Sequence, residues 1–485
     1  MIFRVYALAA KTCTPAFCCL RNRRHLLTVG LILICCMQAL AAPATGATSA
    51  KNSCDVGSLD FDGTSDVQGI EEYKQVITDL LERSDFDTLD CIADAARSTK
   101  ARFPGGLWKL HSIYSSLDEP EGHFTDEDWN TRLLLLKRWT ATNSNSVTAR
   151  VALAGAYASY AWYARGTGTS DSVTDNGWRL FNQRLEKAAA ILDENPALSE
   201  KCPESFLVKQ QIAQGQGVEQ ETALVRHAIS LHPDYYYYYR IHATLLLPKW
   251  YGEEGDASQF AAESADRVGG SDGDILYFQI AGGLVCPCDE PEFNRMSWVR
   301  MQKGFAAAEQ KYGASITNVN LFALMAAKFN DSVAADAAFK RIGVNWDKDT
   351  WITEDYFSQI KGWASQLGPL EAKSRAVMQE AATNEQSPEG SRYKEQVEKQ
   401  FAALVQQCAQ GPDADLQKFV FMLMVGKDGT PENGWMPNPT AMMGCLTKQL
   451  MTAQIKKETP FPPPPHPSYW LRLVMDPAAD KRFSN

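Results

Sequence analysis

Apolar residues recur at steps of three and four along most of the chain, a spacing that places side chains on one face of a helix. The pattern begins after residue 66, where Ile70, Tyr73 and Ile77 share one helical face. Gly and Pro residues interrupt it and so mark the ends of helices. It predicts a mainly helical body over residues 67–408, with helices at 70–81, 89–96, 149–165, 178–192, 205–214, 219–231, 320–328, 333–342, 371–383 and 392–407.

Residues 224–255 show most clearly how these helices are connected. One helix ends before Pro233, and an aromatic helix begins directly after it with the five tyrosines 235–239. Comparable helix-break-helix units lie on both sides, and small residues such as Ala154 and Ala228 allow two helices to approach closely. The pattern predicts packed helical hairpins, and the alternative is an irregular helical domain without true repeats.

The pattern changes after Gly411-Pro412-Asp413, which predicts a domain boundary. Residues 418–425 (KFVFMLMV) predict a strand that runs into a Gly-Lys-Asp-Gly turn. A helix over 440–453, a proline-rich bend and a closing strand over 469–475 follow. Residues 411–485 therefore form a small α+β domain in this interpretation.

The N-terminus has the features of an export signal. Arg21, Arg23 and Arg24 precede an uncharged apolar stretch over 26–36, and a small-x-small site follows at 39–41. We expect a signal peptide over 1–41, a flexible lead-in over 42–66, and a periplasmic or secreted protein. The alternative is an uncleaved anchor, because residues 26–42 are about the minimum length that spans a bilayer. Membrane contact is expected only through this segment.

Composition and charge narrow the classes of function. Hydrophobic residues make up 45% of the 485 residues, and 12 are tryptophans, which indicates a globular protein. The formal charge is −10, and a chain that begins at Ala42 loses five basic residues and carries −15. Such an acidic chain repels the nucleic-acid backbone, so no nucleic acid is expected as a partner.

Seven cysteines remain after the predicted cleavage, and in an oxidising compartment they are disulfide candidates. Pairing within one region favours Cys54 with Cys91 and Cys408 with Cys445. A disulfide from the Cys286-Pro287-Cys288 segment to Cys202 is the third expectation. The alternative for that segment is a metal site, but His242 and His466 are the nearest histidines in the sequence. We expect no metal and no cofactor.

Two resemblances follow from these segments. The stretches AILDENP and AISLHP resemble the second helices of tetratricopeptide repeats, in which a small and an aliphatic residue precede a closing proline. More specifically, ARVALAGAYASYAWYARG, YYYYYRIHATLLLPKWYGEEG and Phe260 resemble an uncharacterised bacterial family with a tetratricopeptide-like helical domain. The similarity covers about residues 125–345 and implies a fold.

The C-terminal order of strand, Asp-Gly turn, helix, proline bend and strand resembles the small C-terminal domain of TonB and TolA proteins. The resemblance implies docking onto periplasmic proteins by sheet-edge pairing, with 418–425 and 469–475 as candidate edges. Tyr469, Trp470 and Arg472 are then candidate binding residues.

The tyrosines 235–239 cannot all face one core, because successive helical residues rotate by about 100°. Tyr236 and Tyr237 would point away from the face shared by the others, and exposed tyrosines are good recognition residues. The alternative is that several packed faces bury all of them.

The loop 248–255 (PKWYGEEG) is the second candidate. Lys249, Trp250, Tyr251 and Glu254 could together hold a polar ligand. The alternative is structural, with Trp250 filling a gap between hairpins while Lys249 and Glu254 solvate the turn.

A catalytic constellation is not evident. Residues 269–273 match G-x-S-x-G, but a nucleophile elbow needs a preceding strand, and residues 257–268 predict a helix. We therefore expect an exported cell-envelope scaffold that binds unidentified envelope proteins and is not an enzyme. The alternatives are an envelope enzyme acting on glycan or peptide, and a TonB-like coupling protein retained by its anchor.

Overall fold

The computed structural model describes residues 66–120, 125–214, 218–286, 290–410, 417–438, 440 and 442–478. The predicted signal segment, residues 42–65 of the lead-in and Cys54 lie outside these residues. The described chain divides into two compact units. The first comprises the residues up to Phe329 together with Ala338–Phe357, and the second comprises Asn330–Ala337 and the residues from Ser358 onward.

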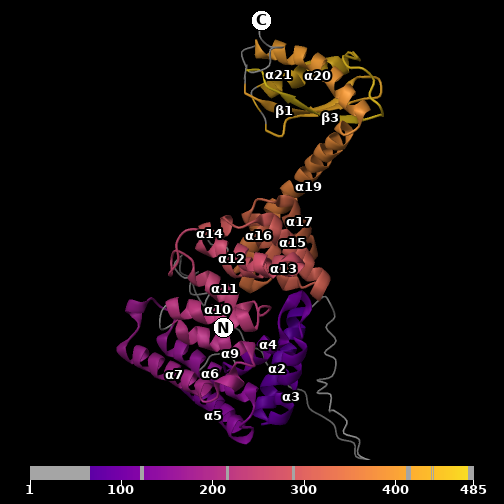
Figure 1. Cartoon of the computed structure of the whole chain (residues 1–485). Helices are drawn as coiled ribbons and strands as arrows, with labels where there is room; N and C mark the ends of the chain where they lie inside the picture. The colour runs from indigo at the N-terminus through magenta and orange to yellow at the C-terminus, as the bar shows by residue number, and fades with distance from the viewer. Residues whose placement is uncertain are drawn as a thin grey trace, which may run out of the picture. The chain divides into compact units, whose positions relative to one another are not determined.

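The first unit is built from packed helices (Figure 1). The short 3-10 turns Pro104–Gly106 and Ser170–Ser172 lie between them. In order, the helices are α2 (Asp66–Glu82), α3 (Phe86–Thr99), α4 (Lys109–Leu117), α5 (Asp126–Thr142), α6 (Val147–Arg165), α7 (Asp175–Asp193), α8 (Pro196–Ser199), α9 (Pro203–Ala213), α10 (Val218–Leu231), α11 (Tyr237–Leu245), α12 (Asp256–Val268), α13 (Gly270–Leu284), α14 (Pro291–Asn294), α15 (Trp298–Tyr312), α16 (Ile316–Lys328), α17 (Ser332–Ile342), which crosses the unit boundary, and α18 (Lys348–Trp351).

Local sequence signals set the ends of these helices. Thr125 and Asp128 form a reciprocal capping box at the start of α5, so the acidic cluster there caps the helix. Ser146 caps α6, its hydroxyl accepting a hydrogen bond from the Ala149 amide at 2.8 Å. Gly166, with φ of 74°, ends α6 in a conformation that glycine favours.

Helix α6 is the centre of this unit. It packs against α5, α7 and α9, and alanines over much of its length are fully buried. These small side chains allow the neighbouring helices to approach closely, as the sequence predicts for residues 149–165. Helix α7 faces it with a stripe of Phe181, Leu185, Ala188 and Leu192, all buried.

The second unit has three layers, with helices on both faces of a small antiparallel sheet. It contains the part of α19 (Glu354–Glu385) from Ser358 onward, α20 (Pro388–Ala409) and α21 (Met442–Ile455). Its three antiparallel strands are β1 (Phe419–Val425), β2 (Pro431–Trp435) and β3 (Tyr469–Met475), in the spatial order β2-β1-β3. The expected fold class, mainly α with a small α+β C-terminal part, is confirmed.

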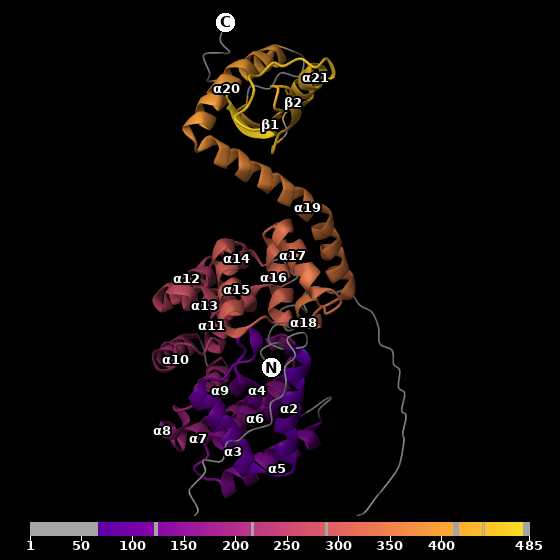
Figure 2. The ribbon, with the colours of Figure 1, turned by 90° about the vertical axis from the view of Figure 1, so that its right-hand side faces the viewer.

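Alternating side chains of the strands fill two cores. On one face, Phe421 and Leu471 pack with Phe401 of α20 and Leu446 of α21. Figure 2 shows α20 and α21 beside the strands. On the other face, Met422 and Trp470 pack with Val377 and Ala381 of α19. The sheet is therefore covered on both faces, and its two longer strands, β1 and β3, are correspondingly apolar over most of their length.

Two expectations about this unit need correction, and one strand was not predicted. The unit begins well before the expected boundary at 411, because α20 supplies part of its core. The strand predicted at 418–425 is not an edge: β1 is central and pairs with both neighbours. Strand β2 is absent from the sequence-based prediction, since PENGW has neither alternation nor β-branched residues. Its Pro431 is tolerated because β2 lies at an edge of the sheet.

The cysteines follow the predictions in part. Cys408 and Cys445 form the expected disulfide, which joins α20 to α21. Cys91 is also in a disulfide bond, and so is Cys286. The expectation for Cys202 is wrong: it is a free thiol, fully buried, with the Tyr114 hydroxyl 3.2 Å from its sulfur.

The G-x-S-x-G match is also resolved. Gly269 ends α12 with φ of 75°, and Ser271 lies in the first turn of α13. A helix, not a strand, precedes the serine, so the nucleophile-elbow geometry is missing. Within the described residues, the helices are all too short or too polar to cross a membrane.

Candidate functional site

All five tyrosines of 235–239 are buried, with exposed fractions between 0 and 6%. The Tyr236 hydroxyl donates to that of Tyr237 at 3.1 Å, and Tyr237 accepts from the Trp108 backbone amide at 3.2 Å. The expectation that Tyr236 and Tyr237 form a binding surface is therefore wrong. Helix α11 begins only at Tyr237, and α9, α10, α12 and α13 surround it, so both side chains meet packed neighbours.

The loop after α11 is different, because its aromatic side chains face solvent. Trp250 is 45% exposed and Tyr251 is 53% exposed. Lys249 is tied to the segment before α14 by an ion pair of 2.7 Å between its Nζ and Oε2 of Glu290. The structure thus brings the aromatic and charged residues predicted here together on one surface loop.

Two further acids hold the end of this loop. Glu254 forms an ion pair with Arg295. Glu292, which is 1% exposed, accepts a hydrogen bond from the Gly255 amide at 2.6 Å. Gly252 lies so close to the Leu246 carbonyl that a Cβ would collide with it. The loop is therefore fixed at several points, and it presents two aromatic side chains at low entropic cost.

An arginine that the sequence analysis missed lies near this loop. Arg165, at the end of α6, lies over the rings of Trp162 and Trp178, with its guanidinium carbon 5.6 Å from each centroid. Burial lowers the pKa of Arg165, and attraction to Tyr251 partly offsets that shift. Arginine and aromatic residues together are the composition that dominates protein-binding surfaces. Their separation along the chain explains why the sequence did not reveal the group.

The three candidates on β3 have unequal exposure. Tyr469 and Trp470 are buried, at 2 and 8% exposed, so they belong to the cores and correct the prediction of a binding role. Arg472 is exposed. Strand β3 pairs only with β1 in the described sheet, and the Asn384 side chain donates to the Trp470 carbonyl at 3.0 Å. This edge is open in part.

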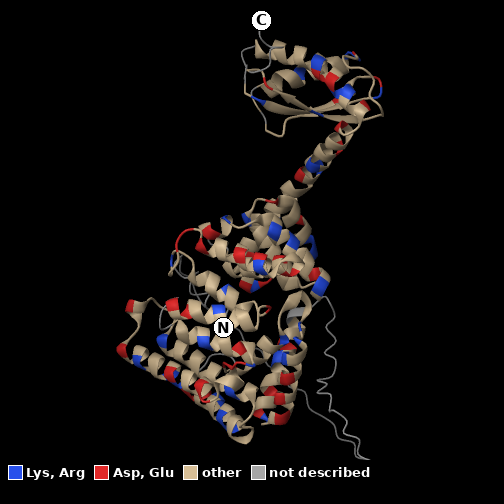
Figure 3. Cartoon of the chain, in the orientation of Figure 1, with Lys and Arg blue, Asp and Glu red and all other residues tan. Residues whose placement is uncertain are grey.

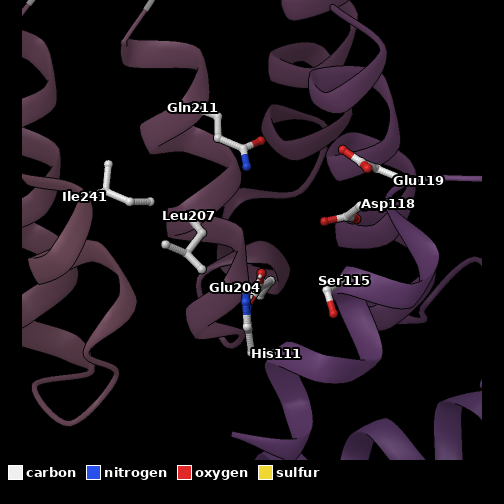
Figure 4. Close-up of a pocket in the computed structure, with 8 residues that line it drawn as sticks. All are labelled: His111, Ser115, Asp118, Glu119, Glu204, Leu207, Gln211 and Ile241. Carbon is white, nitrogen blue, oxygen red and sulfur yellow. Dashed lines mark hydrogen bonds and ion pairs between the residues drawn. The ribbon is translucent and has the colours of Figure 1, made fainter. Parts of the chain in front are cut away.

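A small polar cavity lies between α4, α9 and α11 in the first unit (Figure 4). Its volume is about 30 Å³. Figure 4 shows Ser115, Asp118 and Glu119 on one side and the side chains of α9 and α11 on the other. The lining residues are His111, Ser115, Asp118, Glu119, Glu204, Leu207, Gln211 and Ile241.

Glu204 anchors one wall of this cavity. It is 3% exposed, and its two carboxylate oxygens lie 3.1 and 3.2 Å from Nδ1 of His111. The buried Tyr235 hydroxyl donates to the same carboxylate. Burial, and then the charge of Glu204, raises the pKa of Tyr235 well above its usual range. His111 and Tyr235 therefore compensate the cost of burying the Glu204 carboxylate.

Asp118 is the exception among the acids of this cavity. It follows the last residue of α4 and is 8% exposed. Its Oδ1 is buried and finds no hydrogen-bond donor among the described residues. Burial raises the pKa of Asp118 well above its usual range, and repulsion from Glu204 and Glu119 adds to the rise. Attraction to Arg132 acts in the opposite direction.

A second cavity of about 190 Å³ lies near Arg102 and Tyr312. Its charged groups are paired: Lys311 with Asp272 at 2.6 Å, and Arg102 with Asp234 at 3.8 Å. Paired charges of this kind stabilise a fold, and they leave this cavity without a distinctive ligand-binding group. Both cavities are smaller than most small-molecule sites.

Acidic and basic residues are interspersed along the helices in Figure 3. Across the described ranges, no three His, Cys, Asp or Glu side chains are grouped to hold a metal ion. No protein-family model matches the chain, and neither a curated protein nor a solved structure matches it. The two resemblances therefore stay predictions.

Proposed function

We propose that this protein is an exported scaffold that binds a partner protein through the 248–254 loop and the Arg165 surface beside it. The observation that carries the proposal is the exposure of Trp250 and Tyr251 on a loop held by ion pairs and a buried carboxylate. Two large rings exposed next to each other on a fixed loop form an apolar patch of the kind that marks protein-interaction sites.

The energetics of binding favour this loop over the other predicted surfaces. Aromatic side chains bury much apolar area and have few rotatable bonds, so ordering them costs little. Truncation of one such central residue typically costs about 2 kcal/mol of binding free energy. That cost corresponds to roughly 30-fold in affinity for each ring.

Export rests on the sequence pattern at 21–41, and the disulfide between Cys408 and Cys445 supports it. Structural disulfides form and persist in oxidising compartments. A periplasmic or extracellular partner is the corresponding expectation. The enzyme alternative has less support, because the acidic cavity of about 30 Å³ cannot enclose a sugar ring or a peptide.

The open part of the β3 edge is a second contact surface within the same function. An extended segment of a partner could pair with β3 near Arg472, as strand addition requires an unpaired backbone edge. This contact would also fit the TonB-like alternative. The Asn384 contact shortens the available edge at Trp470.

The test uses the full chain, because a truncation after residue 410 would separate α20 from the strands it packs against. The native protein, the Trp250→Ala/Tyr251→Ala variant and a Val344→Ala control are used to capture partners from an envelope extract. Val344 is 88% exposed in the same unit and so controls for the loss of any exposed apolar side chain.

We expect native protein and the control to retain the same partner and the loop variant to lose it. Affinities measured with that purified partner should fall more than 100-fold for the loop variant. Equal affinity in all three proteins, or no partner captured by the native protein, would contradict the proposal.

A further inference from the structure

A proline-rich segment, residues 461–467 (FPPPPHP), lies between α21 and β3 in the second unit. Each proline fixes its own φ at about −65° and restricts the residue before it to extended conformations. Prolines 462, 463 and 464 are each followed by another proline, and the segment contains neither helix nor strand. Covalent geometry therefore holds residues 462–464 near the polyproline II conformation.

The folded unit holds this proline segment at both ends. Phe461 is 3% exposed and belongs to the core that the sheet forms with α20 and α21. The Tyr393 hydroxyl of α20 donates to the Pro462 carbonyl at 2.9 Å. At the other end, the His466 ring lies against the ring of Tyr469, with the two centroids 4.6 Å apart. Because the segment is ordered before a partner arrives, binding it costs little conformational entropy.

Between these two anchors, the outer side of the proline segment faces solvent. Pro463 and Pro465 are exposed, and Pro462 and Pro464 are partly exposed. The carbonyl groups of prolines 463–465 accept no hydrogen bond from any of the described residues. The segment therefore presents apolar rings together with carbonyl acceptors that no protein group has satisfied.

The chemistry of proline limits the kind of surface that can cover this segment. Proline has no backbone N–H, so prolines 462–465 cannot form a strand ladder with a partner. A partner must instead supply flat apolar area for the rings and hydrogen-bond donors for the carbonyl groups. Tryptophan and tyrosine side chains supply both. Within the second unit, Tyr393 already satisfies the Pro462 carbonyl with its hydroxyl.

We propose that the proline segment binds in a groove of a partner protein, and that Trp and Tyr side chains line this groove. The rings of Pro463 and Pro465 lie against the aromatic rings of the partner, whose N–H and O–H groups donate to the free carbonyl groups. Recognition of this kind exploits a pre-formed polyproline II conformation. The segment belongs to the second unit and the 248–254 loop to the first, so this contact does not depend on the partner of the loop.

The first test uses an SH3, a WW and an EVH1 domain as probes, because all three bind proline-rich segments in aromatic-lined grooves. Each isotope-labelled domain is titrated with the full chain, and binding is followed by NMR. We expect saturable changes at the groove residues of at least one domain. The same domain with one aromatic groove residue replaced by alanine should not bind. Absence of saturable binding by all three domains, or equal binding after that replacement, would overturn the proposal.

Variants of the full chain then assign the binding to this segment. Pro463→Ala/Pro465→Ala removes two exposed rings, leaves the Phe461 and Tyr393 anchors in place, and should weaken binding of the domain at least tenfold. The control is Pro196→Ala, which removes an exposed ring at the first position of α8 in the first unit and should bind as the native protein does. Unchanged affinity in the double variant would refute the assignment. The altered domain decides the proposal even if the double variant does not fold.

Discussion

The disulfide between Cys408 and Cys445 allows a quantitative prediction about the second unit. The two residues are 37 positions apart and join α20 to α21 across the core that covers one face of the sheet. In the chain-entropy description, closing a loop of this length removes about 13 cal/mol/K from the unfolded chain. At 25 °C that entropy corresponds to about 4 kcal/mol of stability.

The perturbation is a Cys408→Ala/Cys445→Ala variant of the full chain. We expect the free energy of unfolding of the second unit to fall by about 4 kcal/mol, and that of the first unit to stay unchanged. Hydrogen exchange followed by mass spectrometry measures both, since β1 and β3 report on the second unit and α6 reports on the first.

The control is native protein treated with a reductant under the same conditions, which breaks the crosslink without removing the sulfur atoms. Because Cys91 and Cys286 of the first unit are disulfide-bonded too, this control is read only at β1 and β3, and α6 is compared only in the double variant. Reduction should reproduce most of the loss in β1 and β3. Slower exchange in β1 and β3, or a loss of unfolding free energy below about 1 kcal/mol, would contradict the prediction. Residual structure would then already restrict the unfolded chain without the crosslink. An equal loss in α6 would show that the two units do not unfold separately.

Two further predictions concern the first unit. Because burial raises the pKa of Asp118, the folded state binds a proton more tightly than the unfolded state, and native stability falls as pH rises from about 4 through the raised pKa. Asp118→Asn should therefore have the same free energy of unfolding as the native protein at acidic pH. At pH values above the raised pKa it should be more stable, by about 1.4 kcal/mol for each unit by which folding raises the pKa of Asp118. The prediction is wrong if urea unfolding gives both proteins the same dependence of stability on pH between 4 and 8. Gly252→Ala should displace the 248–254 loop, because its Cβ meets the Leu246 carbonyl, and should weaken partner binding at least tenfold. A Val344→Ala control should leave affinity unchanged, and equal binding by Gly252→Ala would show that the loop is not rigid.

Much of the helical architecture could be predicted because burial imposes a regular spacing on the sequence. Helix α7 repeats its apolar residues along one face, and α6 ends at Gly166 as expected. Strand β3 occupies the predicted residues 469–475 because alternating sheet faces are both buried. Strand β2 lacks this signal, since it is held by backbone pairing to β1 and not by its side chains.

The sites depend on contacts that no local pattern records. His111 and Glu204 are 93 residues apart in sequence, and α4, α9 and α11 must pack before they line one cavity. Arg165 likewise lies near Tyr251 of the loop only because helices that are distant in sequence pack together. Trp250 and Tyr251 could be named as candidate binding residues because their loop follows directly on an aromatic helix. The burial of Tyr236, by contrast, depends on helices from distant segments.

The unpaired thiol of Cys202 constrains the order of events during maturation. In the folded chain its sulfur is sealed beneath the Tyr114 hydroxyl and cannot exchange with other cysteines. If the chain is exported as we propose, the same thiol in the still unfolded chain competes for every partner that the native disulfides require. Collapse of α4 onto the segment before α9 must therefore outpace oxidation. A chain that folds too slowly would be trapped by its own crosslinks and would depend on an isomerase for rescue.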